Sequence, residues 1–323
     1  MLYLPPASRE PFGGIRVMYQ HVAALRTMGV PAAIVTRAGQ QPPDWFGSDV
    51  PTLASDRLRI GPADALVLPE WNGPALDRLP AGIRCLVFNQ GPYYTFTRVP
   101  EDPSRPARPY DVPGVVGLLT VSHDGVDLLR HTFPQLPVFH TRPPIDPAVF
   151  RPAQSPPGRR IGYLARGRRA EDRDFVLRIL RQREELRGWE LLPISGTQAE
   201  VAAAMRSCAV FLAFGYREGF GLPVAEAMAS GCYVVGYAAM GARELFRLAP
   251  STVVDECDVR AYAIAVRAVL DRFEDDPAAV RADGLQAAES VASTYSLDRL
   301  QADLQTVVDW LGLSVTVADR ADG

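Results

Sequence analysis

The chain of 323 residues is too long for one small hydrophobic core and long enough for two α/β domains of ordinary size. Its 34 basic and 37 acidic residues give a net charge of −3, so no overall basic field favours a nucleic-acid partner. All 34 basic residues are arginine, which excludes chemistry that needs a lysine, such as a Schiff base with pyridoxal phosphate, a P-loop or a protein-kinase ATP site. Any bound anion must therefore be held by arginine or by backbone N–H groups.

The remaining bulk properties are those of a globular enzyme with many turns. Hydrophobic residues make up 47% of the chain, which also has 26 glycines and 29 prolines. No apolar run reaches the roughly 18 residues that span a bilayer, and the first residues lack the pattern of a secretion signal. The four cysteines lack the spacing of a zinc site or a redox pair. We therefore expect a cytoplasmic protein with free thiols.

Short apolar runs alternate with amphipathic stretches along most of the chain, which is typical of parallel sheets covered by helices. In the first half, this alternation predicts strands at 2–4, 32–36, 65–68, 84–89, 117–121 and 138–140, and helices at 15–28 and 124–132. Ser122 is a suitable N-cap for the second of these helices.

A proline-dense segment from Pro143 to Pro157 follows, where neither a helix nor a central strand is favourable. We place the boundary between two Rossmann-like domains in it, so that they span 1–147 and 148–296. In the second half, strands are expected at 161–164, 190–194, 209–214, 233–235 and 252–254, helices at 171–186, 198–207, 223–230, 242–246, 259–273, 277–293 and 297–311, and a polar, flexible tail at 314–323.

The most informative stretch is 214–236, FGYREGFGLPVAEAMASGCYVVG. An apolar strand ends there, Gly219 and Gly221 free the backbone, and Pro223 suits the first turn of a helix. The N–H groups of Phe220 to Leu222 would have no partner within that helix and would point outward with the positive end of its dipole. This arrangement suits a bound phosphate and needs no lysine.

Two carboxylates flank this helix start. Glu218 lies in the loop, and Glu226 lies one turn into the helix. Taken singly, Glu218 fits a solvated loop charge and Glu226 an acid that complements the helix dipole. Taken together, the two can hold hydroxyls on two sugars at once.

The segment EGFGLPVAE resembles the Glu-x7-Glu signature of family 4 glycosyltransferases. By this resemblance, Glu218 would contact hydroxyls of the donor sugar, and Glu226 would contact the ribose of a nucleotide. The donor-binding residues implied in this segment are Glu218, Gly219, Phe220, Gly221, Leu222 and Glu226. The resemblance also implies the GT-B fold, in which two Rossmann-like domains face a central cleft, and a C-terminal helix, 297–313 here, packs back towards the N-terminal domain.

Other segments resemble the same family in the same order. PFGGIRVMYQHVAALRTMGVPAAIVT is similar to its opening glycine loop, helix and second strand, which would place Gly13 and Gly14 against the donor phosphates and the acceptor. Alone, this glycine pair fits equally well a tight turn into a helix. The absence of G-x-G-x-x-G disfavours a dinucleotide-dependent dehydrogenase. LLTVSHDGVDLLRHTF and RPPIDPAVFRP resemble the crossing between the two domains.

In this family, an arginine and a lysine usually meet the donor phosphates after the first strand of the C-terminal domain. Arg166 matches that arginine by position, and Arg168 or Arg169 is the candidate for the lysine. A guanidinium can grip two phosphate oxygens at once. The arginines that follow are expected on a solvated helix face, with contact to a membrane surface or an acidic partner as the alternative: Arg173, Arg178, Arg181, Arg183 and Arg187.

The clearest departure from the family follows the strand 84–88. Many members have a histidine there, whereas this chain reads Asn89-Gln90-Gly91-Pro92-Tyr93-Tyr94. Asn89 and Gln90 can hydrogen-bond to sugar hydroxyls but cannot act as an acid or base. We take Asn89, with Glu218 and Arg166, as the catalytic candidates, and Gln90, Tyr93 and Tyr94 as acceptor-side residues. The alternative is a polar turn at a strand end.

The sequence thus predicts a retaining glycosyltransferase that moves a sugar from a nucleotide diphosphate sugar to a hydroxyl of a sugar, lipid or small-molecule acceptor. Neither a metal nor a cofactor is expected, because the histidines lack metal spacing and the acids of Asp172-Arg173-Asp174 fit the first turn of a helix. The alternatives are an inactive GT-B scaffold or regulatory partner of another transferase, and a nucleotide-sugar epimerase. The sequence does not identify the nucleotide base, the donor sugar, the acceptor or the oligomeric state.

Overall fold

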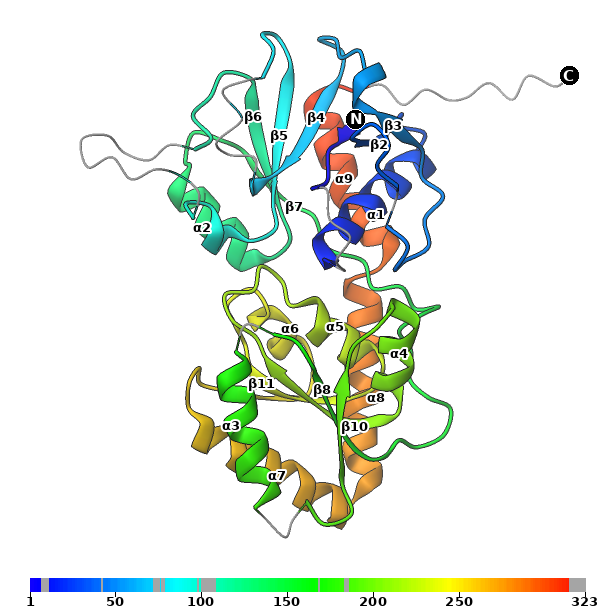
Figure 1. The fold of residues 1–323 in the computed structure, drawn as a ribbon, viewed down its shortest axis with the longest axis vertical. Helices are drawn as coiled ribbons and strands as arrows, with labels where there is room; N and C mark the ends of the chain where they lie inside the picture. Colours follow the sequence, from blue (N-terminus) through cyan, green and yellow to red (C-terminus); the bar gives the residue numbers. More distant parts are fainter. Residues whose placement is uncertain are drawn as a thin grey trace, which may run out of the picture. The chain divides into compact units, whose positions relative to one another are not determined.

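The chain folds into two units, each a parallel sheet covered by helices (Figure 1). The computed structural model describes residues 1–6, 12–41, 43–71, 76, 79–97, 99, 109–167, 169–182 and 186–313. The first unit comprises Met1–Pro144 and Leu297–Gly323, and the second comprises Ile145–Ser296. The chain therefore leaves the first unit at 144 rather than at the 147 expected from its prolines.

The described part of the first unit contains a seven-stranded parallel sheet in the order β3-β2-β1-β4-β5-β6-β7. Its strands are β1 (Leu2–Tyr3), β2 (Ala33–Thr36), β3 (Thr52–Ala54), β4 (Ala65–Pro69), β5 (Arg84–Asn89), β6 (Val115–Thr120) and β7 (Val138–His140). The sequence did not predict β3, because this edge strand has three residues and its side chains are largely exposed, so no apolar alternation marks it.

Helices cover both faces of this sheet, with α2 on one side and α1 and α9 together on the other (Figure 1). The helices are α1 (Gly13–Thr27), α2 (His123–Thr132) and α9 (Leu297–Leu311), and the short 3-10 turns are η1 (Ser55–Arg57) and η3 (Pro92–Tyr94). Ser122 caps α2 by accepting a hydrogen bond from the Gly125 backbone N–H at 3.1 Å.

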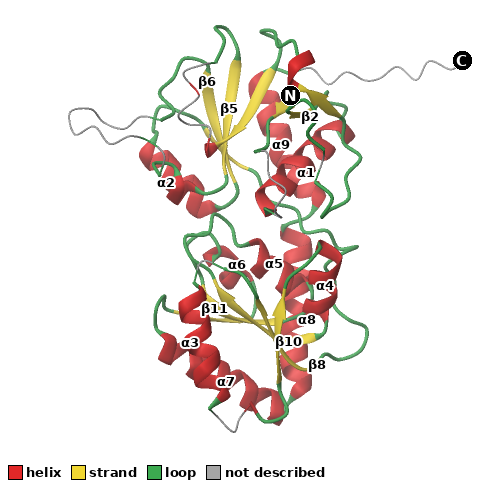
Figure 2. Cartoon of the chain, viewed as in Figure 1, coloured by secondary structure: helices red, strands yellow, loops and turns green. Residues whose placement is uncertain are grey.

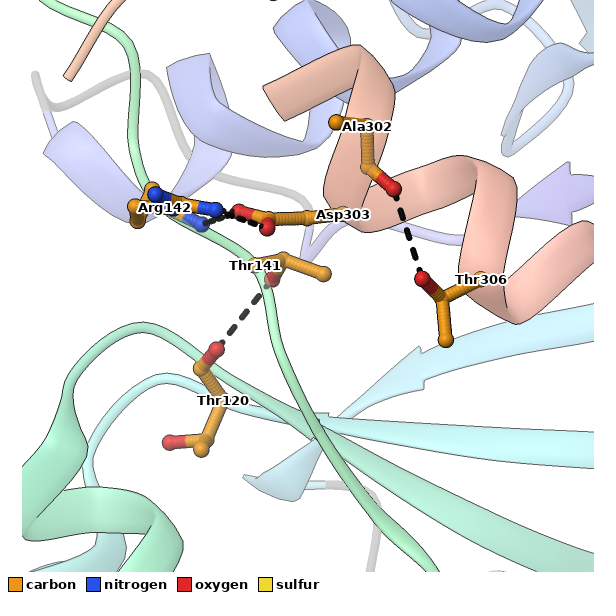
Figure 3. A network of polar contacts seen from close by, with 6 residues as sticks. All are labelled: Thr120, Thr141, Arg142, Ala302, Asp303 and Thr306. Carbon is orange, nitrogen blue, oxygen red and sulfur yellow. Dashed lines mark hydrogen bonds and ion pairs between the residues drawn. The ribbon is translucent and has the colours of Figure 1, made fainter. Parts of the chain in front are cut away.

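The last helix, α9, is fixed to the first unit by a hydrogen-bonded ion pair (Figure 3). The backbone N–H and Nε of Arg142 donate to one carboxylate oxygen of Asp303 at 2.9 and 2.8 Å, and Nη2 of Arg142 bonds the other oxygen. Next to it, the Thr141 backbone N–H and Oγ1 donate to the Thr120 carbonyl. These contacts hold the segment after β7 against both α9 and the end of β6.

The second unit is built around a five-stranded parallel sheet in the order β12-β11-β10-β8-β9. In it, α3 and α7 pack together on one face and α4, α5 and α8 cover the other (Figure 2). The elements are β8 (Gly158–Leu164), α3 (Ala170–Arg181), β9 (Glu190–Ile194), α4 (Gln198–Arg206), β10 (Cys208–Phe214), α5 (Leu222–Ala229), β11 (Tyr233–Tyr237), α6 (Arg243–Leu248), β12 (Ser251–Val254), α7 (Val259–Asp275) and α8 (Pro277–Thr294).

Both sheets reverse their strand order at one point, between β1 and β4 in the first and between β8 and β10 in the second. At such a point, the connections leave in opposite directions, and a crevice opens outside the carboxyl ends of the two strands. The fold therefore offers one crevice in each unit. None of the helices in the described part of the chain combines the length and apolar character that a membrane span requires.

Candidate active site

A pocket lies at the carboxyl ends of β8 and β10, where the second sheet reverses its order. Three arginines and one carboxylate line it, together with the start of α5 and apolar residues of β10. Its lining consists of Leu164, Arg166, Gly167, Arg169, Ala170, Arg173, Phe211, Leu212, Ala213, Phe214, Gly215, Glu218, Gly221, Pro223, Val224, Tyr237, Ala239 and Ala242. Such a pocket is mainly apolar, with a few charged groups directed to one place.

The loop that carries Glu218 is braced against the loop that follows β11. The Glu218 backbone N–H donates to the Ala239 carbonyl at 3.0 Å, and the Gly241 N–H donates to the Glu218 carbonyl at 3.0 Å. A Cβ on Gly241 would lie 2.1 Å from the Gly219 carbonyl oxygen, so only glycine allows this approach. Non-glycine residues of both loops have left-handed backbone conformations, namely Arg217, Ala239 and Met240. Such strain collects at functional sites and is held by the surrounding contacts.

The start of α5 faces the same pocket. Gly221 is its N-cap with φ 92°, and a Cβ there would lie 2.7 Å from the Ala242 Cβ. The buried ring of Phe220 packs edge-on against Tyr295 with 4.8 Å between ring centroids. These contacts fix the helix start, whose positive dipole end favours an anion. Leu222 is the first residue of the helix.

The two motif carboxylates have different surroundings. Glu218 is partly exposed and lines the pocket. Glu226 is 7% exposed on α5 and is not among the residues that line this pocket in the described part of the chain. The structure therefore brings Glu218 to the arginines, whereas Glu226 lies in the packed interior of the helix layer.

Of the three arginines singled out after β8, Arg166 is exposed and lines the pocket, and Arg169 lines it with a side chain held in place. Arg169 donates to Glu256 Oε2 at 2.8 Å, and its guanidinium lies 4.5 Å from the ring centroid of Tyr216. Arg168 lies outside the described residues. Arg166 is thus the more accessible charge, and Arg169 is the more rigid one.

The expectation of a solvated helix face was wrong for Arg173. Its side chain is 13% exposed and lines the pocket, and its Nη1 donates to the carbonyls of Leu164 at 3.3 Å and Ala165 at 2.6 Å. These carbonyls end β8 and need donors. The arginine therefore hydrogen-bonds the end of the strand, and it is a third guanidinium in the pocket lining, ion-paired with Asp174 at 2.8 Å.

The prediction that Asn89 contacts the sugar is corrected by its burial. Asn89 is 0% exposed at the end of β5, and its Nδ2 donates to Thr95 Oγ1 at 2.7 Å and to the Tyr110 hydroxyl at 2.9 Å. Both hydrogens of this amide are used within the fold, and its Oδ1, which has no hydrogen-bond partner among the described residues, is on a side chain with no exposed surface. Asn89 instead fixes the loop that follows β5.

Gln90 connects that loop to α1. Its Nε2 donates to the Gly14 carbonyl at 3.0 Å, and a Cβ on Gly14 would lie 3.1 Å from the Gln90 amide. Gly13 and Gly14 are the first residues of α1 rather than part of a free loop. The two predicted segments therefore meet at the carboxyl edge of the first sheet, where the small size of Gly14 allows the contact.

The two tyrosines that follow extend the same loop. The Tyr93 hydroxyl bonds a carboxylate oxygen of Asp124 at the start of α2. The Tyr94 ring packs against Gly91, since a Cβ there would lie 3.2 Å from Tyr94 Cδ2. The predicted acceptor-side residues thus lie on one loop, which is tied to α1 by Gln90 and to α2 by Tyr93.

The sequence reading missed Glu70, which directly follows β4 beside this loop. Its Oε1 lies 3.2 Å from where a Cβ on Gly91 would be, and its buried Oε2 has no hydrogen-bond partner among the described residues. Burial raises the pKa of Glu70 to about 7, although the backbone N–H groups of Gln90 and Gly91 favour the charged form. The sequence does contain a signal for this residue, since Glu70 directly follows the apolar run ALVLP, where a strand ends.

Known proteins resemble this chain in sequence and in fold. The family model described as glycosyl transferases group 1 matches residues 178–281. An alpha-1,6-glucosyltransferase of Actinobacillus pleuropneumoniae serotype 7 (strain AP76) is 28% identical over 256 residues, 73% of this chain and 72% of that protein. Sucrose-phosphate synthase from Thermosynechococcus elongatus has a TM-score of 0.68 at 14% identity, covering 96% of this chain and 98% of its own. HepE from Anabaena, in complex with UDP-glucose, has a TM-score of 0.60 at 12% identity, covering 95% and 99%.

These similarities confirm the predicted fold class: the protein has the GT-B fold, with two parallel-sheet α/β units. They also support a glycosyltransferase, because both the family model and the sequence relative are of this kind. The match of the family model lies within the second unit and includes the loop of Glu218, α5 and Glu226.

Proposed function

We propose that the protein is a retaining, metal-independent glycosyltransferase of the family 4 type, which transfers a sugar from a nucleotide diphosphate sugar to an acceptor hydroxyl. The observation that carries the proposal is the pocket of the second unit, in which three arginines, one carboxylate and a helix start meet at the reversal of the sheet. Positive groups fixed around a space suit a diphosphate, and a carboxylate beside them suits sugar hydroxyls.

In this proposal, the arginines stabilise the leaving group. Arg166 binds the diphosphate directly, while Arg169 and Arg173, held by their own contacts, contribute positive charge that needs no reorganisation during the reaction. The N–H groups at the start of α5 add to this field. Glu218 accepts hydrogen bonds from the donor sugar. The ribose contact expected of Glu226 would need its buried carboxylate to be reached from outside the pocket lining, so it stays a prediction.

The transfer itself needs no side-chain base. The acceptor oxygen forms its bond to the anomeric carbon on the face from which the diphosphate leaves, so the configuration is retained. The bond from that carbon to the phosphate oxygen breaks, and this oxygen takes the proton of the acceptor hydroxyl. The absence of a histidine after β5 is compatible with this route, because the proton passes from acceptor to leaving group.

A uridine nucleotide carrying glucose is the first donor to test. One sequence relative is named an alpha-1,6-glucosyltransferase, and HepE, which has a similar fold, was solved with UDP-glucose. In the proposed assignment, the second unit binds this donor and the first unit binds the acceptor.

The experiment measures binding of UDP and UDP-glucose by calorimetry and transfer to a panel of acceptors. Arg166→Ala should weaken UDP binding by about tenfold to a hundredfold, because a charged hydrogen bond to phosphate is lost. Arg178→Ala is the matched control, since Arg178 is an exposed arginine on α3 that does not line the pocket. The anomeric configuration of the product tests the retaining mechanism, and activity in the presence of EDTA tests the independence from metal ions.

Binding of no nucleotide, or equal binding by Arg166→Ala and Arg178→Ala, would refute the proposal. A role as an inactive scaffold has one observation in its favour, which is that the amides of Asn89 and Gln90, both engaged within the fold, stand where the family has a histidine. Nucleotide binding without transfer or hydrolysis would identify that role.

A further inference from the structure

The reversal point of the first sheet carries a carboxylate that the proposed transfer mechanism does not use. Glu70 directly follows β4, next to β1 in the sheet, and α1 begins after β1. Gln90 links this place to α1 through its bond to the Gly14 carbonyl. Glu70 therefore lies in the position at which open α/β sheets bind ligands, outside the carboxyl ends of the strands that flank the reversal.

One oxygen of this carboxylate is left for a ligand. Oε1 faces the Gly91 backbone, whereas Oε2 is buried and has no hydrogen-bond partner among the described residues. A buried carboxylate oxygen without a donor is unfavourable, and native structures rarely leave one. Since the cost disappears when a hydroxyl donates to it, the geometry favours a bound group with hydroxyls.

Two partly exposed aromatic rings lie next to each other beside Glu70, and one of them, Trp71, interacts with the carboxylate. Trp71 follows it in the chain and is 38% exposed, and a hydrogen bond from its side chain to the carboxylate favours the charged form of Glu70, while Oε2 keeps no partner among the described residues. Phe12 precedes α1 and is 44% exposed, and the two rings pack edge to face with 6.1 Å between their centroids. Large exposed rings beside an unpaired acceptor are typical of a binding surface rather than of a core.

We propose that Glu70, Trp71 and Phe12 form a sugar-binding subsite of the first unit, in which Glu70 Oε2 accepts a hydrogen bond from a hydroxyl of a carbohydrate acceptor and the rings pack on its C–H face. This inference rests on the proposed glycosyl transfer and narrows its acceptor from a sugar, lipid or small molecule to a carbohydrate. An acyl chain would satisfy the rings but would leave the carboxylate oxygen without a donor.

The alternative is that Glu70 only ties β4 to the loop after β5. The two roles differ in what a glutamine does at this position. Glutamine keeps the shape and an oxygen that can face the Gly91 N–H, but it replaces the other carboxylate oxygen with an NH2 group, which cannot accept a hydrogen bond from a sugar hydroxyl. A purely structural tie therefore survives Glu70→Gln, whereas a sugar contact weakens.

The test uses the full-length protein, with methyl α-D-glucopyranoside and a panel of oligosaccharides as acceptors and UDP-glucose as donor. Glu70→Gln and Trp71→Ala should each raise the acceptor KM, or weaken acceptor binding seen by saturation-transfer NMR, by about tenfold or more. The Kd of UDP and the rate of UDP-glucose hydrolysis by water should stay within about twofold of the wild-type values.

Two variants control for general effects. Asp56→Asn removes an exposed acid of the first unit, and Trp310→Ala removes a tryptophan of the same unit that is also partly exposed and also packs against a phenylalanine. Both should leave the acceptor KM unchanged. Thermal unfolding of each variant shows whether it is folded.

Three results would overturn the subsite: an unchanged acceptor KM in both test variants, no binding of any sugar by the wild type, or transfer to lipid acceptors only. Loss of UDP binding by the wild type is a different result, because it refutes the proposed glycosyl transfer as well. Measurements of UDP binding and UDP-glucose hydrolysis therefore distinguish failure of the subsite from failure of the proposed glycosyl transfer.

Discussion

The two reversal points of this protein have the same topology and opposite chemistry. In the second unit, Arg166, Arg169 and Arg173 surround a pocket beside a helix start, and the adjoining loops have left-handed residues. In the first unit, the side-chain amides of Asn89 and Gln90 donate within the fold, whereas three buried oxygens at the strand ends, Glu70 Oε2, Asn89 Oδ1 and Thr120 Oγ1, have no hydrogen-bond partner among the described residues. An edge lined by guanidinium groups and a helix start suits a diphosphate, and an edge with unpaired oxygen acceptors suits hydroxyls.

This comparison shows that topology fixes where a ligand can bind, while the residues at the strand ends decide what it is. Asn89 illustrates the point. It was expected to contact the reacting sugar, but it is buried and donates a hydrogen bond that holds its own loop.

The strongest test of the second edge is Gly241→Ala. The added Cβ would lie 2.1 Å from the Gly219 carbonyl oxygen and 2.7 Å from the Glu218 carbonyl oxygen, so the two braced loops must separate. We expect a loss of more than about 4 kcal/mol of unfolding free energy, or a local opening of the loops that abolishes UDP binding. Chemical unfolding and calorimetry measure the two outcomes.

Gly158→Ala is the control for this substitution, since nothing lies within 4 Å of its added Cβ. It should be nearly neutral. A stable Gly241→Ala protein with normal UDP affinity would show that the bracing is dispensable for the donor site.

Acid should destabilise the first unit before the second. All four histidines lie in the first unit, and burial lowers the pKa of His21 to about 3 from its ordinary 6.5. Between these pH values, the unfolded chain binds a proton that the folded unit does not, so the free energy of unfolding falls as the pH drops below about 6.5. The full effect of His21 is on the order of 5 kcal/mol. His140, whose pKa is lowered to about 4 chiefly by burial, acts in the same direction. Glu70, whose pKa burial raises to about 7, opposes both histidines between about pH 7 and its ordinary pKa of 4.5, so the net loss is largest below that range.

Urea unfolding between pH 7 and pH 4 can follow the first unit alone in a Trp189→Phe variant, because the other three tryptophans lie in that unit. Replacing His21 by leucine should flatten the pH dependence, whatever its effect on stability at pH 7. Replacing the exposed His131 by asparagine should leave the dependence unchanged. A first unit that unfolds independently of pH would contradict the assignment.

Asn89→Ala tests whether the edge of the first unit is structural at this position. The substitution leaves the buried Thr95 hydroxyl and the Tyr110 hydroxyl without their donor, which should cost about 1–3 kcal/mol of unfolding free energy. UDP affinity in the second unit should not change, and transfer should fall only as far as the acceptor loop is loosened. A full loss of transfer in a protein of normal stability would restore Asn89 to the catalytic candidates.

The sequence was sufficient for the elements that carry a strong local pattern. The bounds of β5, β7, β9 and α9 agree with the expected ranges, because each is an apolar run or an amphipathic stretch between clear breakers. It also predicted Arg166, Arg169, Glu218 and Gly221, which line the pocket, because they follow strands or begin a helix.

What the sequence could not supply were contacts that depend on the tertiary fold. Arg173 belongs to a run of arginines on α3. Only the tertiary structure shows that its guanidinium donates to the carbonyls at the end of β8. Glu70 stands next to Gly91 although twenty residues separate them, because β4 and β5 are neighbours in the sheet. Burial, which decided the role of Asn89, is likewise a property of the whole unit.

The smallest effect expected concerns two helix caps, one from each unit. Ser122 is buried and accepts from the Gly125 N–H, whereas Thr197 is exposed and forms a reciprocal capping box with Glu200 at the start of α4. Ser122→Ala should cost about 1–2 kcal/mol, because the N–H that it leaves is buried, and Thr197→Ala should cost about 0.5–1 kcal/mol, because water can replace its hydroxyl. Since α2 also carries the Asp124 carboxylate that holds Tyr93, Ser122→Ala should raise the acceptor KM slightly, and Thr197→Ala should leave it unchanged. Urea unfolding measures both losses of unfolding free energy. Equal losses would mean that the burial of Ser122 adds nothing to the stability of its helix cap.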